Sequence, residues 1–96
     1  MDKTIYLINI YDYYEELLTE KQREYFKDYY FKNLSLSEIS ENKKISRNAI
    51  YKVIKETEKK LNYYEETLKL YKKSLKIKKI IKNLDEKIKK EIEELI

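Results

Sequence analysis

The chain contains neither glycine nor proline. Hairpins and tight turns normally depend on these two residues, so their absence argues against a sheet of many short strands. Lys, Glu, Leu, Ile and Tyr are abundant instead, and 42% of the residues are charged, as expected of long helices with solvated faces. With 96 residues the chain can form one domain with a modest core. We therefore predict an all-α protein.

Residues 34–56 contain two helix starts separated by a short turn. Ser35 and Glu38 have the spacing of a capping box, in which each side chain binds the other residue's backbone N–H. The helix that begins there should bury Leu36 and Ile39, with the small Ser40 beside them, before the chain turns through residues 42–44. Ile45 then returns to the core. This order of signals predicts the first half of a helix-turn-helix.

The second helix of the motif should begin at Ser46, a candidate N-cap. One of its faces is apolar, and helical spacing places on it Ile50, Val53, Ile54, Thr57 and Leu61. The opposite face is polar and basic, with Asn48, Lys52, Lys55 and Lys59 at its centre and Arg47 and Tyr51 on its flank.

A basic helix face of this kind suits the major groove of duplex DNA, which admits one α-helix. Asn48 is suited to pair with adenine and Arg47 with guanine, while Lys52, Lys55 and Tyr51 would contact phosphates. The alternative is an ordinary pair of packed helices whose outer face is charged because it meets water. We favour nucleic-acid binding over this alternative.

The charge is unevenly distributed along the chain. Residues 1–18 carry −3, residues 47–60 carry +3, and residues 69–84 contain seven lysines and no acid, within a net charge of +4. The basic regions begin at the predicted recognition helix, which favours an anionic partner. The lysine-rich segment is either a second phosphate-contacting surface, a patch for a ribonucleoprotein, or the solvated side of an amphipathic helix. Binding to a membrane surface is a weaker possibility.

Several chemistries lack their usual residues. Without Cys or His there is no disulfide, thiol nucleophile, Cys/His zinc site or imidazole base, and no glycine-rich phosphate loop exists. The carboxylates lie beside lysines in mixed helical runs, where solvated faces are the simpler interpretation. We therefore expect a non-enzyme without metal or cofactor. No signal peptide and no membrane span is evident, so we expect no membrane insertion and a cytoplasmic location.

Two further helices should precede the motif. Residues 4–18, with Thr4 as a candidate cap, place six apolar side chains at helical spacing: Leu7, Ile10, Tyr11, Tyr14, Leu17 and Leu18. Thr19 and Gln22 form another capping box, which opens a helix to about Phe31. Its aromatic residues could be a stacking platform for single-stranded nucleic acid, but we favour a role in the core. They are Tyr25, Phe26, Tyr29, Tyr30 and Phe31.

No stop signal follows Leu61, and alternating spacings of three and four continue the apolar pattern as a heptad seam. The seam consists of Leu61, Tyr64, Leu68, Tyr71 and Leu75. It would either fold back on the first helix or form the interface of a homodimer. Near Ser74 the register changes to a new stripe, Ile77, Ile81, Leu84, Ile88, Ile92 and Leu95, and Ser74 or Asn83 could cap a terminal helix. We divide the chain into a DNA-binding domain, residues 1–62, and a helical extension, residues 63–96.

A combination of short motifs is more specific than the general pattern. It consists of Leu18-Thr19, Gln22-Arg23, Tyr29-Tyr30, Leu36 to Ile39, Ser46-Arg47, Tyr51 and Tyr64-Glu65. With these motifs, residues 17–73 resemble the small bacterial YlxM-like proteins, helix-turn-helix proteins related to region four of primary sigma factors. The leading helix, residues 4–16, is similar to theirs as well, whereas the lysine-rich segment after residue 75 lies outside the resemblance.

The resemblance implies a supporting helix at residues 36–42 and a recognition helix from Ser46 onward. Many helix-turn-helix motifs have Gly where this chain has Lys44, so a left-handed backbone is expected there. The family often has Gly at the position of Lys69, and a helix break expected there would be shifted or lost. The family's link to the signal recognition particle genes implies an alternative function: a non-DNA-binding accessory protein that docks on the particle's RNA or GTPase.

Overall fold

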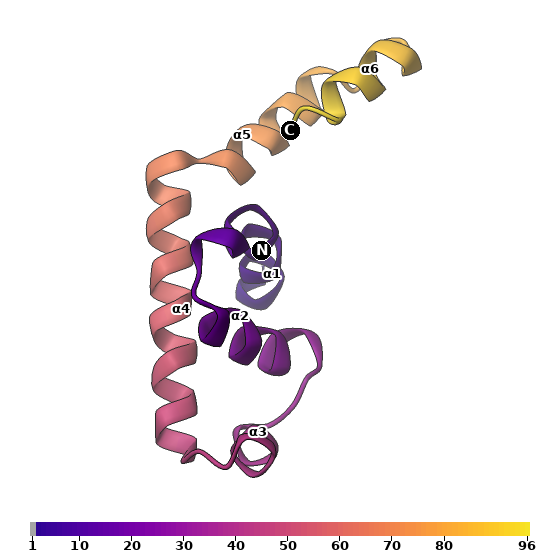
Figure 1. Ribbon diagram of the computed structural model, residues 1–96. Helices are drawn as coiled ribbons and strands as arrows, with labels where there is room; N and C mark the ends of the chain where they lie inside the picture. The colour runs from indigo at the N-terminus through magenta and orange to yellow at the C-terminus, as the bar shows by residue number, and fades with distance from the viewer. Residues whose placement is uncertain (1) are drawn as a thin grey trace.

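The computed structural model describes residues 2–96, which form helices and turns without any strand (Figure 1). The α-helices of this part of the chain are α1 (Lys3–Tyr14), α2 (Glu20–Phe26), α3 (Leu36–Lys43), α4 (Arg47–Leu68), α5 (Leu70–Ile80) and α6 (Glu86–Glu93). A 3₁₀ turn, η1 (Glu15–Leu17), follows α1, and a π-helical turn, η2 (Lys27–Phe31), extends α2. The prediction of an all-α fold is confirmed.

The long helix α4 is the central element of the fold, to which the other parts connect (Figure 1). Helices α1, α2 and α3 all pack against it from one side, and α5 and α6 leave its far end as an arm. The molecule is therefore elongated, with extents of 52 × 24 × 24 Å. At 1.5 Å per residue, the 22 residues of α4 span about 33 Å and separate the arm from the turn between α3 and α4.

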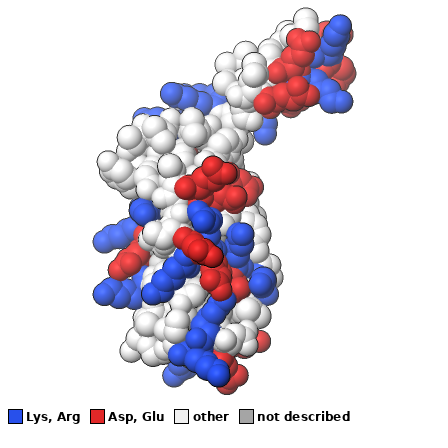
Figure 2. Space-filling view, viewed as in Figure 1, with Lys and Arg blue, Asp and Glu red and all other residues white. Residues whose placement is uncertain are grey.

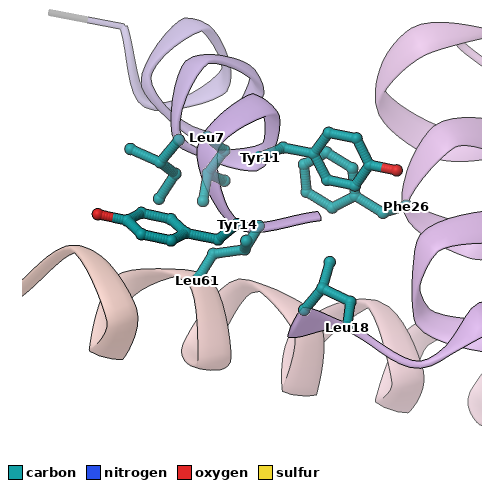
Figure 3. Packing of buried hydrophobic residues seen from close by; sticks show 7 residues of the cluster. Leu7, Tyr11, Tyr14, Leu18, Phe26 and Leu61 are labelled. Carbon is teal, nitrogen blue, oxygen red and sulfur yellow. The ribbon is translucent and has the colours of Figure 1, made fainter. Parts of the chain in front are cut away.

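One hydrophobic cluster joins α1 to the middle of α4 (Figure 3). The Tyr11 ring stacks on Phe26 with centroids 4.6 Å apart, and Tyr14 lies over Leu61 of α4. The buried members are Leu7, Ile10, Tyr11, Tyr14, Leu18, Phe26 and Leu61. The predicted apolar face of the first helix thus forms the core, except that Leu17 is exposed because the chain tightens into η1 before reaching it.

A second cluster holds the helix-turn-helix together. It consists of the buried residues Tyr25, Ile39, Ile50 and Ile54, with Leu34, Leu36, Ile45 and Val53 packed around them. The apolar stripe predicted for α3 and α4 is therefore the stripe that the fold buries. Of the predicted core aromatics, Tyr25 and Phe26 are buried and Tyr30 packs against both clusters, whereas Tyr29 and Phe31 are exposed. These two lie within the π-helical turn η2, which changes the register of the helix.

Among the first four helices, local sequence signals located three starts correctly. The capping boxes at Thr19–Gln22 and Ser35–Glu38 are both present with reciprocal hydrogen bonds. The exception is α1, which is capped by Asp2 rather than by Thr4: the Asp2 carboxylate accepts from the Thr4 backbone N–H at 2.7 Å. This correction moves the start of the first helix to Lys3.

The C-terminal third differs more from expectation. The predicted seam is not continuous, because α4 ends at Leu68 and Lys69 adopts a left-handed backbone with φ of 57°. The break therefore lies at Lys69 itself, neither shifted nor lost. The seam residues Leu61, Tyr64 and Tyr71 pack into the α1 cluster, as the intrachain alternative required, while Leu68 and Leu75 stay exposed. The predicted domain boundary at residue 62 falls inside α4.

Neither candidate cap of the terminal segment is used. Ser74 lies buried in the middle of α5, and α6 is capped by Asp85, whose carboxylate accepts from the Lys87 backbone N–H at 3.2 Å, rather than by Asn83. Of the new apolar stripe, Ile81 is buried, whereas Leu84, Ile88 and Leu95 are exposed. Among the described helices, none combines the length and apolar character needed to cross a membrane.

Candidate nucleic-acid interface

The turn between α3 and α4 is fixed by short-range hydrogen bonds. Lys44 caps α3 in the left-handed conformation that was expected there, with φ of 57°. The Ser40 hydroxyl donates to the Ile45 carbonyl at 2.5 Å, and the Ile45 backbone N–H donates to the Ser40 carbonyl at 3.3 Å. Ile45 is thereby held over the second cluster, and the next residue is free to start a helix. The orientation of α4 relative to α3 follows from this turn.

Ser46 is the N-cap of α4, as predicted, because its hydroxyl accepts from the Ala49 backbone N–H at 3.2 Å. The cap places the predicted contact residues on the first three turns of α4, where Arg47, Asn48, Tyr51, Lys52 and Lys55 are all exposed. At 3.6 residues per turn they cover an arc of about 140° outside the buried stripe of Ile50 and Ile54, with Arg47 at the edge next to Ile54. One continuous surface thus contains the entire predicted set.

Some of these side chains have partners within the chain. Arg47 lies against α3, with its Nη1 atom 3.4 Å from the Ser37 hydroxyl oxygen. The Lys55 ammonium is 5.3 Å from the centroid of the Tyr51 ring and 3.3 Å from a carboxylate oxygen of Glu58. These three contacts are partly solvated and weak, so an incoming phosphate or base can replace them. Lys52 has no ion pair with any residue of the described chain.

Glu58 borders this surface on its C-terminal side along α4. It is buried, accepts a hydrogen bond of 2.5 Å from the Tyr30 hydroxyl, and lies 3.9 Å from the Lys3 ammonium. Burial of the hydroxyl, reinforced by the hydrogen bond to Glu58, raises the pKa of Tyr30 well above its ordinary value. The Tyr30 proton therefore stays in place at neutral pH, and the pair joins α4 to η2 behind the exposed face.

A shallow groove runs along α4 beside Glu58. It is lined by Lys3, Tyr51, Lys52, Lys55, Glu56, Glu58, Lys59 and Asn62. Four of these residues are lysines, so the groove offers an anion more positive than negative charge. The sequence placed Lys59 on this face but gave no indication of Lys3, because the first helix is acidic overall. Ser37 was missed for a similar reason, since only the turn geometry brings α3 beside Arg47.

The exposed surface at the start of α4 offers hydrogen-bond donors and positive charge. Within residues 2–96 there is no group of three or more His, Cys, Asp or Glu side chains that could hold a metal ion. The exposed groups of the interface are a guanidinium, a carboxamide, a phenol and ammonium groups, which are donors suited to phosphates and base edges. The fold and this surface together define the class: an all-α helix-turn-helix protein.

The comparisons with known proteins agree with this class. The model of the UPF0122 family, described as "Putative helix-turn-helix protein, YlxM / p13 like", matches residues 1–96, and the chain belongs to this family. A UPF0122 protein of Halalkalibacterium halodurans is 44% identical over 91 residues, which are 95% of this chain and 84% of the relative. One of Oceanobacillus iheyensis is 46% identical over 84 residues, 88% of this chain and 80% of the relative.

A relative from Caldanaerobacter subterraneus is also similar, at 44% identity over 85 residues, or 88% of this chain and 73% of that protein. The expected resemblance to YlxM-like proteins is therefore confirmed. The match of the family model extends beyond residue 75, into the arm that the resemblance did not cover.

Proposed function

We propose that this protein binds duplex DNA through the exposed face at the start of α4. The observation that carries the proposal is the position of Arg47, Asn48 and Lys52 on the first turns of α4, directly after a capped helix start and opposite a buried stripe. This is the part of a recognition helix that reaches base edges in the major groove. The family description as a helix-turn-helix protein supports the proposal.

The residues have different roles in this binding. Asn48 and Arg47 read base edges, because a carboxamide pairs with adenine and a guanidinium with guanine through two hydrogen bonds each. Lys52, Lys55 and Tyr51 contact phosphates and set the position of α4 on the duplex. Ser46 acts indirectly, because it caps α4 and so fixes the helix start. The remaining free backbone N–H groups in the first turn of α4 then face the nearest phosphate. We assign the protein no catalytic activity and a regulatory role on DNA.

The double variant Arg47→Ala with Lys52→Ala tests the assignment. Loss of two charged contacts should lower the affinity for a mixed-sequence duplex at least tenfold and reduce the salt dependence of binding. The matched control is Lys87→Ala with Lys90→Ala, which removes the same charge from exposed positions of α6. An unchanged affinity of the first variant, or an equal loss in both, would contradict the assigned face.

A dimer would place two recognition helices on one duplex, and we propose that this chain forms one. Of the five seam residues first considered, Leu68 and Leu75 are 44% and 43% exposed and available to a second copy, whereas Leu61 is buried in its own chain. Further apolar side chains on the arm are exposed as well, namely Ile80, Leu84, Ile88 and Leu95. The arm rather than the middle of α4 is thus the dimer surface.

A second candidate function is that of an accessory protein on the signal recognition particle. The family resemblance and the basic residues after Lys69 support it, because a lysine-rich helix suits both an RNA and an acidic protein surface. Co-purification with the particle's RNA or GTPase at low salt is the direct test. A preparation that retains neither component would count against this function and leave the DNA proposal untouched.

A further inference from the structure

The helix α5 is basic to a degree that no other part of the chain matches. No acidic residue occurs between Glu66 and Asp85, and this interval contains seven lysines: Lys69, Lys72, Lys73, Lys76, Lys78, Lys79 and Lys82. All seven are exposed. At spacings of three and four residues they repel one another along the helix, which disfavours α5 unless an anion is bound nearby.

These lysines also lack partners in the folded chain. Elsewhere, lysines such as Lys32, Lys43 and Lys89 lie within ion-pair distance of carboxylates. None of the seven lysines forms an ion pair with any residue of the part that the structure describes. In Figure 2 the acidic side chains of the arm lie toward its far end, away from its base. Among the described residues, no carboxylate of α6 lies within ion-pair distance of a lysine of α5.

The spacing concentrates part of this charge on one side of the helix. Lys72, Lys76 and Lys79 follow one another at four and three residues, so they project from the same face of α5. Ser74 and Ile81, which are buried, lie on the opposite side of α5. We call Lys72, Lys76 and Lys79 the lysine face. It is therefore directed away from the core.

The junction between α4 and α5 holds the lysine face in a fixed place. The buried Glu65 carboxylate accepts from the backbone N–H groups of Tyr71 and Lys72, at 3.2 and 3.0 Å. The Tyr14 hydroxyl donates to the same carboxylate at 2.6 Å and accepts from the Leu70 N–H at 3.1 Å. The first turn of α5 is thus capped by residues of α4 and α1, and its orientation relative to α4 is set by buried groups.

We infer that the lysine face of α5 is a second phosphate-binding surface, which contacts the backbone of the same DNA duplex beyond the C-terminal end of the recognition helix α4. The inference rests on the proposed function, because the recognition helix supplies the first contact. From Tyr51, in the middle of the contact residues, to the end of α4 at Leu68 is about 26 Å along the helix, which corresponds to roughly eight base pairs at 3.4 Å each. Ammonium groups bind phosphates without reading bases, so this surface adds affinity and salt dependence but no sequence preference.

The test is the salt dependence of binding to a mixed-sequence duplex of about 24 base pairs, long enough to reach both surfaces. The variant is Lys72→Gln, Lys76→Gln and Lys79→Gln, and the control is Lys87→Gln, Lys89→Gln and Lys90→Gln on α6. Each phosphate contact contributes a slope of about 0.9 to the plot of log affinity against log salt concentration. The α5 variant should therefore lose about 2.7 from the slope, and the control should keep the wild-type slope. Circular dichroism confirms that both variants are folded.

An unchanged slope in the folded α5 variant would overturn the inference, as would an equal loss in the α6 control. A loss seen with an RNA hairpin but not with the DNA duplex would also overturn it and assign the surface to RNA. The proposed function fails separately, because Arg47→Ala with Lys52→Ala reports on the recognition helix alone. If that variant binds normally and the α5 variant does not, the recognition helix rather than the lysine face has been misassigned.

Discussion

Lys44 and Lys69 occupy backbone positions that glycine normally takes, each with a positive φ of 57°. A non-glycine residue in this conformation costs about 1 to 2 kcal/mol, because its Cβ atom crowds the following carbonyl. Both residues nevertheless end a helix, so tertiary packing on either side must compensate for the strain. At Lys44 the compensation comes from Ile45, which is held over the core of the helix-turn-helix.

Replacing Lys44 with glycine should therefore stabilise the protein. We expect Lys44→Gly to raise the free energy of unfolding by up to about 1 kcal/mol. The substitution relieves the backbone strain, but part of this gain is offset because glycine has more conformational entropy in the unfolded chain. Glu41→Gly is the matched control inside α3 and should lower stability by about 1 kcal/mol. Urea denaturation measures both changes. Equal destabilisation by the two substitutions would show that the backbone at Lys44 is not strained.

Tyr14 makes the stability sensitive to high pH. Burial, together with the hydrogen bond to Glu65, raises the pKa of Tyr14 to about 12. In the unfolded chain its pKa is about 10, so the folded state favours the protonated phenol. The resulting stabilisation is complete below about pH 10 and is lost as the pH rises toward 12.

The measurement is urea denaturation across this pH range, on the wild type and on Tyr14→Phe. The variant should be less stable at neutral pH and should lose less stability between pH 10 and 12, because one of the groups that titrate is gone. Tyr30, whose pKa is also raised by burial, retains its own contribution in both proteins. Identical losses in the two proteins would contradict the assignment to Tyr14.

At the scale of elements, the sequence predicted the helix boundaries that depend on residues close together in the chain. The starts at Thr19, Ser35 and Ser46 depend on a side chain and a backbone N–H three residues apart, so the sequence alone located them. The end of α4 depends on contacts that are remote in sequence. Glu65, on the other side of the break, caps the first turn of α5. The Tyr14 hydroxyl accepts a hydrogen bond from the backbone N–H of Leu70, which is 56 residues away in sequence. Without glycine at position 69, nothing local marked this break.

The candidate site shows the same division. Arg47, Asn48, Tyr51, Lys52 and Lys55 share a face because one helix carries them all, so their common surface was predictable from spacing. Lys3 and Ser37 join that surface from other helices, and only the packing of α1 and α3 on α4 brings them there. Side chains from other elements that border the interface could not be found by periodicity.

The helix α4 depends on the side chains that bury its inner face. Leu61 is fully buried between α1 and α4, so Leu61→Ala should lower the free energy of unfolding by about 2 to 5 kcal/mol. Leu68→Ala, on the same helix but 44% exposed, should cost less than about 1 kcal/mol. Thermal or urea denaturation compares the two. Similar costs would mean that α1 does not pack on α4 as described.

At the scale of the whole molecule, the two proposed binding surfaces are separated along α4. The helix-turn-helix lies at one end, and the arm with its lysines and exposed apolar side chains lies at the other (Figure 1). The capped junction at Glu65 and Tyr14 makes this separation a fixed property of the fold. An arm that is both basic and apolar can contact phosphates with one face of α5 and a second copy with another.

The proposed dimer is a prediction at this scale. Sedimentation equilibrium at micromolar concentration should give twice the mass of one chain. Leu84→Glu with Ile88→Glu should shift the protein to the monomer, since both substitutions put charge into an apolar interface. Circular dichroism of the variant checks that the monomer remains folded. A monomeric mass for the wild type would overturn the prediction.

The central claim is that the first turns of α4 bind duplex DNA, and amide NMR tests it most directly. The measurement is a titration of the labelled protein with a mixed-sequence duplex at low salt, followed residue by residue through backbone amide shifts. We predict the largest shifts at residues 46–55, weaker shifts in α5, and none on the acidic outer side of α1. Shifts confined to α1 or α6, or no shifts at all, would contradict the claim.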